Sequence, residues 1–436
     1  MFYLNFFVSP IEWHVFPLCW HRFTITKLHI PLVFFHYRFI DAEILMSFDF
    51  DGARLKDPNL TAEHEEWRSQ LRRFIDVEVA PYYDDWDEAG KLPDEIRRKA
   101  AKIGLLQLGY DEKYGGITEG TNYYHHQIVS EELSRVGTAG GLVSSLLIHN
   151  IGLPPVANFS SNKIKAEVVP AVISGEKCIS LGITEPSGGS DVANIKTTAR
   201  RDGDFYIVNG SKTFISGGLC ANWISTAVRT GGEGASGVSM LLIPTDLDGV
   251  TRVSINRKQG WWISETASIY FDNVRVPIDN LIGVENKGFK VILNNFNNER
   301  MSMITFMEAS ARVCLEDAVN WARERETFGK RLAEHQVIRH KIVQMKQKIN
   351  ATQAYMQLVA RTIVEGAPNF GDIALLKVQA SETLEYCARE ASQILGGASY
   401  VRGTRIERIY REVRVSAIGG GSEEIMRDLA ASQYDL

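Results

Sequence analysis

The chain has 436 residues, of which 44% are hydrophobic and 23% are charged, and its formal net charge is -5 at pH 7. This is the composition of a soluble globular protein, and a chain of this length can bury more than one core, so we expect two or three packed units. The slight negative charge argues against a nucleic-acid-binding protein, whose phosphate contacts require clustered Lys and Arg.

The five cysteines are scattered along the chain and odd in number. They show no paired metal-ligand spacing, so we expect no metal site, and a reducing compartment is the simplest account of them. We therefore expect a cytoplasmic protein, or a protein of the mitochondrial matrix if the organism is a eukaryote.

Residues 1–45 differ from the rest of the chain, because they hold twelve aromatic residues and four of the ten histidines. Charged residues interrupt each apolar run before it reaches the ~20 residues of a membrane span. The segment also lacks the early basic residues of an export signal and the Ser- and Arg-rich bias of a transit peptide. We expect Met46 to be the natural start, and residues 1–45 to be an over-extended reading frame or a dispensable tail outside the fold.

Residues 46–175 are predicted to form a helical domain. Thr61 can cap a helix that ends at Pro81, and Pro93 suits the first position of a second helix. The apolar periodicity predicts further helices over residues 121–136, 140–150 and 162–173.

Residues 176–284 are predicted to form a β domain, because short β-type runs replace the helical periodicity. The dipeptide Asn209-Gly210 favours a tight hairpin turn, since both residues tolerate positive φ. A compact antiparallel barrel or sandwich fits this pattern. The expected strands cover residues 178–183, 205–208, 213–215, 223–228, 238–243 and 267–271.

Residues 285–436 are predicted to form a C-terminal four-helix bundle. Long helices are expected over residues 286–323, 334–365 and 370–395, followed by a shorter pair. The order of helices, strands and helices predicts an α+β fold with a β domain wedged into a helical bundle.

Two motifs of the β domain could contact a ligand. The loop from Thr184 to Asp191 is rich in glycine and small hydroxyls, which lets a planar ligand approach the backbone, although an ordinary turn has the same composition. In the run from Asn209 to Gly218, Phe214 and Ser216 alternate on one face. They could contact a flavin ring, or they could simply pack.

A third motif runs from Arg323 to Arg331, where we expect a helix to end at Gly329. Helix electrostatics favours cations in a last turn in any case. The more specific alternative to this electrostatic explanation is that Arg325 binds a phosphate group.

Two further motifs concern carboxylates. One is the helical run from Asn294 to Met301, which contains the pair Glu299-Arg300, and the other is the glycine-rich run from Ile418 to Met426. The five motifs together, in this order, resemble the acyl-CoA dehydrogenase family over residues 50–436.

The resemblance implies a flavoenzyme of three domains that assembles as a homotetramer or homodimer. It implies FAD as the cofactor, an acyl-CoA thioester as the substrate and an electron-transferring flavoprotein as the electron acceptor. By position in the matching motifs, the substrate would contact Ser190, Asn297, Arg300 and the backbone N–H of Gly420. The cofactor would contact Leu181, Ile183, Thr184, Phe214, Ser216, Arg325, Phe328, Gln336, Gln393, Gly396, Gly397, Ser422 and Glu424, partly across a subunit boundary.

The resemblance also bears on the catalytic base. In many members a glutamate of the C-terminal motif removes the α proton, but here the matching position is Gly420, which has no side chain. A smaller branch, which includes isovaleryl-CoA and long-chain acyl-CoA dehydrogenases, places the base directly before the arginine of the long helix, and Glu299 matches that position. Burial must then raise its pKa toward neutrality. The reaction that the resemblance implies is the conversion of acyl-CoA to trans-2-enoyl-CoA.

The alternatives remain open at this point. Glu299 could be a solvated helix glutamate beside Arg300, and Glu265, Glu423 and Glu424 are rival carboxylates that do not match a base position. Arginines recur at every third residue from Arg402 to Arg414. This stripe could mark a non-catalytic or DNA-associated flavoprotein of the same fold, although ion pairs at a subunit boundary would also explain it. The length and branching of the acyl group stay undetermined.

Overall fold

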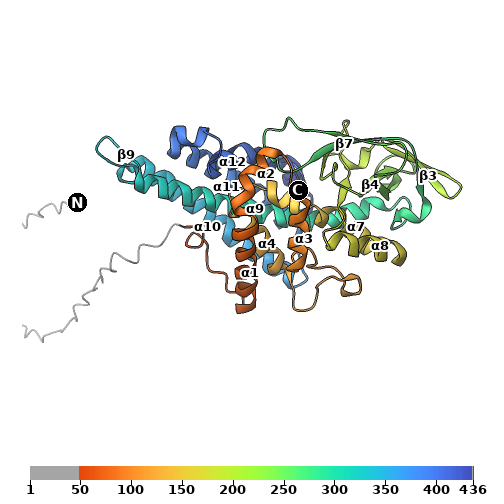
Figure 1. The fold of residues 1–436 in the computed structure, drawn as a ribbon, viewed down its shortest axis with the longest axis horizontal. Coiled ribbons are helices and arrows are strands. Elements are labelled where there is room, and N and C mark those ends of the chain that lie inside the picture. Colours follow the sequence, from red (N-terminus) through yellow and green to blue (C-terminus); the bar gives the residue numbers. More distant parts are fainter. Residues whose placement is uncertain (1–48, 435) are drawn as a thin grey trace, which may run out of the picture. The chain divides into compact units, whose positions relative to one another are not determined.

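The computed structural model describes residues 49–434 and 436. The expectations for residues 1–45 and for the start at Met46 therefore lie outside the described residues. Within them, helices come first, a β-sheet follows, and helices return to the end of the chain, as predicted (Figure 1).

The N-terminal helices begin with α1, which Thr61 caps through a hydrogen bond from His64 N–H, as the sequence predicts. This helix ends three residues before Pro81, and a short 3₁₀ turn carries the chain past the proline. The helices are α1 (Ala62–Glu78), α2 (Tyr83–Ala89), α3 (Asp94–Lys102), α4 (Tyr123–Ser134), α5 (Gly141–Leu146), α6 (His149–Gly152), α7 (Pro154–Phe159) and α8 (Asn162–Ile173).

The middle sheet has the strand order β6-β7-β3-β2-β4-β5-β8, and β1 pairs with β4. Its described strands form an open path, and β4 pairs in parallel with both β1 and β2, so the predicted antiparallel barrel is wrong in these details. The strands are β1 (Ile179–Gly182), β2 (Thr198–Asp202), β3 (Phe205–Ser216), β4 (Trp223–Arg229), β5 (Val238–Pro244), β6 (Val250–Ser254), β7 (Thr266–Pro277) and β8 (Leu281–Ile282).

The predicted hairpin turn at Asn209-Gly210 is also wrong. Strand β3 continues through both residues, and its register with β7 shifts between Val208 and Gly210, which is a β-bulge. Gly210 has φ +143°, and a Cβ there would lie 2.6 Å from the Cα of Thr197, so glycine is required by a close approach and not by a turn. The hairpin that precedes β3 turns instead at Gly203.

The C-terminal helices are α9 (Gly288–Glu324), α10 (Gln336–Val364), α11 (Phe370–Leu395), α12 (Arg405–Glu412) and α13 (Glu423–Gln433). Helix α9 ends at Glu324, one residue after the end of the range predicted from periodicity and five residues before Gly329, where the cationic motif predicted a helix end. Phe328 and Gly329, both with positive φ, instead form the turn between two short strands, β9 (Glu326–Thr327) and β10 (Lys330–Arg331).

Helix α9 joins the sheet to the bundle. Val291 and Ile292 in its first turns belong to the hydrophobic core that α7, α8 and the sheet share. From Met301 onward its side chains enter the separate core formed with α1, α4, α10 and α11. Glu299 and Arg300 therefore lie where the two cores meet, and the bundle extends from there to the β9–β10 hairpin at its far end (Figure 1).

Candidate active site

Glu299 lines a cavity of about 690 Å³ that α4 and α9 border, together with Ser216 of β3 and the loop residue Trp261. Its side chain is half-buried and forms no hydrogen bond or ion pair with any described residue. Burial raises the pKa of Glu299 to about 7, although the neighbouring Arg300 charge opposes the shift. The structure thus contains an unpaired carboxylate that can exchange a proton near neutral pH.

Arg300 connects the two carboxylate motifs, which lie far apart in the sequence. Its Nε donates a hydrogen bond to the carbonyl oxygen of Gly420 at 3.2 Å, and its Nη1 donates to Oδ1 of Asn297 at 3.0 Å. Arg300 is only 8% exposed. The structure therefore brings Asn297, Arg300 and Gly420 together one residue from Glu299.

A side chain at Gly420 would require a positive φ and a shift of the Met303 side chain. Gly420 has φ +65°, and a Cβ there would lie 2.5 Å from Sδ of Met303. Met303 follows Glu299 by four residues, so both lie on the same face of α9. The N–H of Gly420 has no acceptor among the described residues and is free to donate to a ligand.

The rival carboxylates lie elsewhere or are already paired. Glu265 lines a different cavity, which Cys178 and Cys220 also line. Glu423 accepts a hydrogen bond from Ser381 at 2.5 Å, and Glu424 is exposed at the start of α13. Among the carboxylates named from the sequence, only Glu299 both lines the large cavity and lacks a partner.

The predicted flavin residues of the β domain lie together. Leu181 and Ile183 lie at the end of β1, and a backbone hydrogen bond of 2.9 Å from Thr213 to Thr184 joins the following loop to β3. The hydroxyls of Thr184 and Ser216 form no hydrogen bond with any described residue, so both can contact a ligand.

A buried ion pair fixes this loop. Nζ of Lys212 donates to Oε1 of Glu185 at 2.8 Å and to the carbonyl oxygen of Ile183 at 3.0 Å. Both charged side chains are almost fully buried. Burial lowers the pKa of Lys212 to about 8, and Glu185 opposes the shift.

Phe214 is 67% exposed and has φ +57°. Such a backbone conformation costs roughly 1–2 kcal/mol for a side chain other than glycine. An exposed aromatic residue that is held in a strained conformation is typical of a functional site. The residues at these ends of β1 and β3 therefore fit a planar aromatic ligand.

The other predicted cofactor residues do not lie near this group. Arg325 follows the last residue of α9, so about 39 Å of helix separates it from Glu299. Phe328, which is 97% exposed with φ +53°, lies in the adjacent hairpin. We call Phe328 and five other exposed residues at the ends of α9, α10 and α11 the distal group. The five are Arg325, Gln336, Gln393, Gly396 and Gly397.

The three remaining predicted residues lie on loops and caps. Ser190 is exposed in the loop after Thr184. The hydroxyl of Ser422 caps α13 by accepting a hydrogen bond from Ile425 N–H, and Glu424 lies in the first turn of that helix.

The arginine stripe is not a free basic surface. Each of its five arginines forms an ion pair with a carboxylate of this chain, such as Arg405 with Glu316 and Arg408 with Asp84. Arg402 and Arg411 also lie over the ring of Trp262. These ion pairs form within one chain, so a subunit boundary is not required to explain the stripe. The DNA-associated alternative also loses its support, because the stripe was the observation that suggested it.

Several cavity residues belong to none of the sequence motifs. Trp261 donates from Nε1 to the carbonyl oxygen of Ala139 at 2.9 Å and packs edge-on against Phe306. Tyr110, Asn150 and the polar face of α4 were not singled out either. The signal that could have found the last of these is the number of polar residues in α4, a helix that is buried on nearly every side.

The part of the chain that the structure describes has neither a membrane-spanning helix nor a cluster of metal ligands. None of the helices is both long and apolar enough to cross a membrane. In the same part of the chain, no group of three or more His, Cys, Asp or Glu side chains could hold a metal ion.

The sequence matches the models of three domains of one family. These are the N-terminal domain of acyl-CoA dehydrogenase over residues 61–176, the middle domain over 180–274 and the C-terminal domain over 286–434. The acyl-CoA dehydrogenase AFT10-1 of Alternaria alternata is 36% identical over 85% of this chain and 91% of its own. The long-chain specific acyl-CoA dehydrogenase of Rattus norvegicus mitochondria is 31% identical over 86% of each chain.

Solved structures agree with the sequence relatives. A probable acyl-CoA dehydrogenase from Mycobacterium abscessus has a TM-score of 0.83 and 39% identity, over 86% of this chain and 99% of its own. A glutaryl-CoA dehydrogenase from Mycobacterium smegmatis in complex with FADH2 has a TM-score of 0.80 and 25% identity, over 86% of this chain and 95% of its own. The chain belongs to the acyl-CoA dehydrogenase family of flavoprotein oxidoreductases.

Proposed function

We propose that this protein uses FAD to convert an acyl-CoA thioester to the trans-2-enoyl-CoA, with Glu299 as the base that removes the α proton. The observation that carries the proposal is the unpaired Glu299 carboxylate, with its pKa of about 7, in the large cavity. A base for a carbon acid works best when its pKa lies near the working pH.

The neighbourhood of Gly420 supports this choice of base. A glutamate at that position would require a side chain on a backbone with φ +65°, in space that Met303 occupies. Glu299 lies one helical turn from Met303 on the same face of α9. A base on the helix can therefore reach the region that a base on the glycine-rich loop would reach in other members.

The chain can also stabilise the charge that develops on the thioester oxygen. The free N–H of Gly420 is a donor that needs no side chain, and the hydrogen bond from Arg300 to the Gly420 carbonyl holds this part of the loop. A preorganised donor stabilises the enolate without reorganisation during the reaction.

The residues at these ends of β1 and β3 fit a flavin ring. Phe214 offers an exposed aromatic face, and the hydroxyls of Thr184 and Ser216 are free to bond with it. When bound there, FAD would supply the acceptor for the hydrogen and the electron pair that leave the β carbon. We propose an electron-transferring flavoprotein as the next acceptor, in the cytoplasm or the mitochondrial matrix.

The distance between the two groups of cofactor residues supports a shared site. About 39 Å of helix separates Arg325 from Glu299, so one chain cannot place both groups on one flavin nucleotide. We propose that the distal group serves the flavin of a second copy, in a homodimer or homotetramer. The two groups of one chain would then belong to two different active sites.

Flavin bleaching by acyl-CoA thioesters tests the proposal. The wild-type protein should bind FAD and lose its flavin absorbance when a panel of acyl-CoA thioesters of different length and branching is added without oxygen. Glu299→Gln should retain the flavin and lose bleaching by at least a thousandfold, because the positioned base is gone.

Glu265→Gln is the matched control, since it neutralises a carboxylate that lines a different cavity. It should bleach at a rate close to the wild type. Normal bleaching by Glu299→Gln would sink the assignment of the base. A flavin that no thioester bleaches, in the wild type, would instead favour the non-catalytic flavoprotein.

A further inference from the structure

One wall of the large cavity carries polar side chains at helical spacing. Five residues of α4 line the cavity, the apolar Val129 and four polar residues, and the positions i, i+3, i+4 and i+7 of the four place them on a single face. A cavity that binds only an unsubstituted hydrocarbon chain would be expected to have apolar side chains on this face instead. The four residues are Tyr123, His126, Gln127 and Ser130.

Three of these side chains have unused hydrogen-bonding groups, and one of the three groups is the buried hydroxyl of Tyr123. Gln127 is only 7% exposed, and its buried Oε1 has no partner among the described residues. Neither ring nitrogen of His126 forms a hydrogen bond there. Leaving a buried polar group unpaired costs about tenfold or more in an equilibrium constant, so such groups normally have a partner or a ligand.

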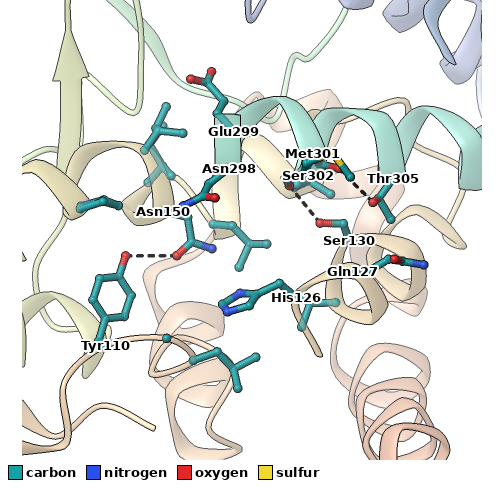
Figure 2. Close-up of a pocket in the computed structure, with 18 of the residues that line it drawn as sticks. Tyr110, His126, Gln127, Ser130, Asn150, Asn298, Glu299, Met301, Ser302 and Thr305 are labelled. Atoms are coloured by element: carbon teal, nitrogen blue, oxygen red, sulfur yellow. Dashed lines mark hydrogen bonds between the residues drawn. The ribbon is translucent and has the colours of Figure 1, made fainter. Parts of the chain in front are cut away.

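Asn150 adds a further unused group to the same cavity. Its Oδ1 accepts a hydrogen bond from the Tyr110 hydroxyl at 3.2 Å, which leaves its amide N–H groups free. Figure 2 shows the ring of His126 directed toward the space beside Asn150 and Tyr110. In the same view, the Glu299 carboxylate points away from these side chains, so they can contact a part of the ligand that is remote from the reacting carbons.

Water can satisfy these groups only while the ligand is absent. An alkyl chain that displaces ordered water without replacing its hydrogen bonds loses affinity. A hydroxyl on the chain can replace them, because it can donate to Oε1 of Gln127 and accept from the amide of Asn150, whereas a keto oxygen can only accept, from Asn150 or His126. The remaining lining is largely apolar, with Leu147, Trp261 and Phe306 among its members, which suits the hydrocarbon portion.

The charges of the lining exclude an acyl group with a terminal carboxylate. The described residues that line the cavity include no Lys or Arg. Burial lowers the pKa of His126 to about 4, with a smaller contribution from His125, so the imidazole is neutral at physiological pH. A second carboxylate in this cavity would have no cation to pair with.

We propose that the acyl group of the substrate carries a neutral oxygen substituent that hydrogen-bonds with the unpaired side chains of this wall: a hydroxyl, which can donate to Gln127 or accept from His126 or Asn150, or a keto group, which can accept from His126 or Asn150. This inference rests on the proposed dehydrogenation and names its substrate class. It goes beyond the choice of base, because it concerns a part of the cavity that the chemistry at the α and β carbons does not use.

Matched pairs of thioesters test the inference on the flavin-bound enzyme. Octanoyl-, decanoyl- and dodecanoyl-CoA are each compared with a hydroxylated counterpart whose hydroxyl lies at or next to the far end of the chain. The bleaching kcat/KM of the best hydroxylated thioester should exceed that of its unsubstituted partner by at least fivefold. The variants Gln127→Leu and Asn150→Leu should each lower or reverse this ratio.

Thr305→Val is the matched control for the ratio. Thr305 lines the same cavity, but its hydroxyl already donates to the carbonyl oxygen of Met301 at 3.0 Å, so the variant should leave the ratio unchanged. Unsubstituted thioesters that bleach the flavin as well as every hydroxylated partner would overturn the inference and leave the proposed function intact. Failure of all thioesters would overturn the proposed function and the inference with it.

Discussion

Removing the carboxylate of Glu299, the proposed base, should make the protein more stable, and increasingly so as the pH rises. The pKa of Glu299 is about 7 in the folded chain, compared with 4.5 for a free glutamate, because burial penalises the charged form. Above pH 4.5 the unfolded chain releases this proton more readily than the folded chain does. Ionisation of Glu299 therefore lowers the free energy of unfolding progressively between these two values, and Glu299→Gln escapes that penalty.

The size of the effect follows from the shift. One pKa unit corresponds to 1.36 kcal/mol, so the full penalty above neutral pH is about 3 kcal/mol, and partial exposure of the side chain makes this an upper bound. Part of the penalty is already present at mildly acidic pH. Between about pH 5.5 and about pH 8.5 we expect the stability advantage of Glu299→Gln to grow by about 2 kcal/mol, or about 2 °C in Tm for a chain of this size.

Thermal unfolding of the wild type and Glu299→Gln at these two pH values measures the effect. Both proteins are compared without substrate and at equal flavin content. Glu265→Gln serves as the control and should show no such pH-dependent difference. The difference in Tm between Glu299→Gln and the wild type could instead be equal at both pH values or shrink as the pH rises. Either result would refute the claim that burial raises the pKa of Glu299.

Three further predictions concern the groups that support the site. Glu185→Gln leaves the charge of Lys212 buried without its partner, so it should lower the free energy of unfolding, measured by urea denaturation, by about 3–5 kcal/mol. It should also weaken flavin binding. The double variant Glu185→Gln with Lys212→Met should recover much of the lost stability. Arg300→Gln removes the hydrogen bond to the Gly420 carbonyl, so it should lower the bleaching kcat/KM about ten- to a hundredfold while the flavin stays bound; an unchanged kcat/KM would contradict that role. Arg325→Ala should lower the ratio of flavin to protein in the purified enzyme, although the residue lies far from Glu299, and full flavin retention would count against a site shared between copies.

The helices could be predicted closely because their signals are local. The apolar periodicity predicts a helix over residues 286–323, and α9 spans Gly288–Glu324. Thr61 begins α1 because a hydroxyl at that position accepts a backbone hydrogen bond of the first turn. The motif around Glu299 could likewise be found from the sequence, since its residues are neighbours in the chain.

The sheet was less predictable because its pairing is not local. Asn209-Gly210 has the composition of a hairpin turn, but the close approach of Thr197 and the pairing of β3 with β7 keep the strand extended through it. No local pattern shows that β1 and β2 run parallel to β4. Such pairings depend on contacts between distant residues.

The cavity could not be predicted for the same reason. Gln127 and Asn150 come from separate helices, and only their approach to α9 makes them part of one cavity with Glu299. The steric role of Met303 beside Gly420 is also visible only in three dimensions. The proposal of Glu299 in place of Gly420, by contrast, came from the resemblance to the family, and it stays a prediction.

Exchange of the α hydrogen with solvent tests the central claim most directly, because it isolates proton removal from the later steps. The flavin-bound enzyme is incubated in D₂O with an acyl-CoA analogue that has no hydrogen at its β carbon, and deuterium at the α carbon is followed by mass spectrometry. We predict exchange by the wild type that increases with pH around a midpoint near 7, and at least a thousandfold slower exchange by Glu299→Gln with the flavin still bound. Exchange by Glu299→Gln at the wild-type rate would show that another group removes the proton.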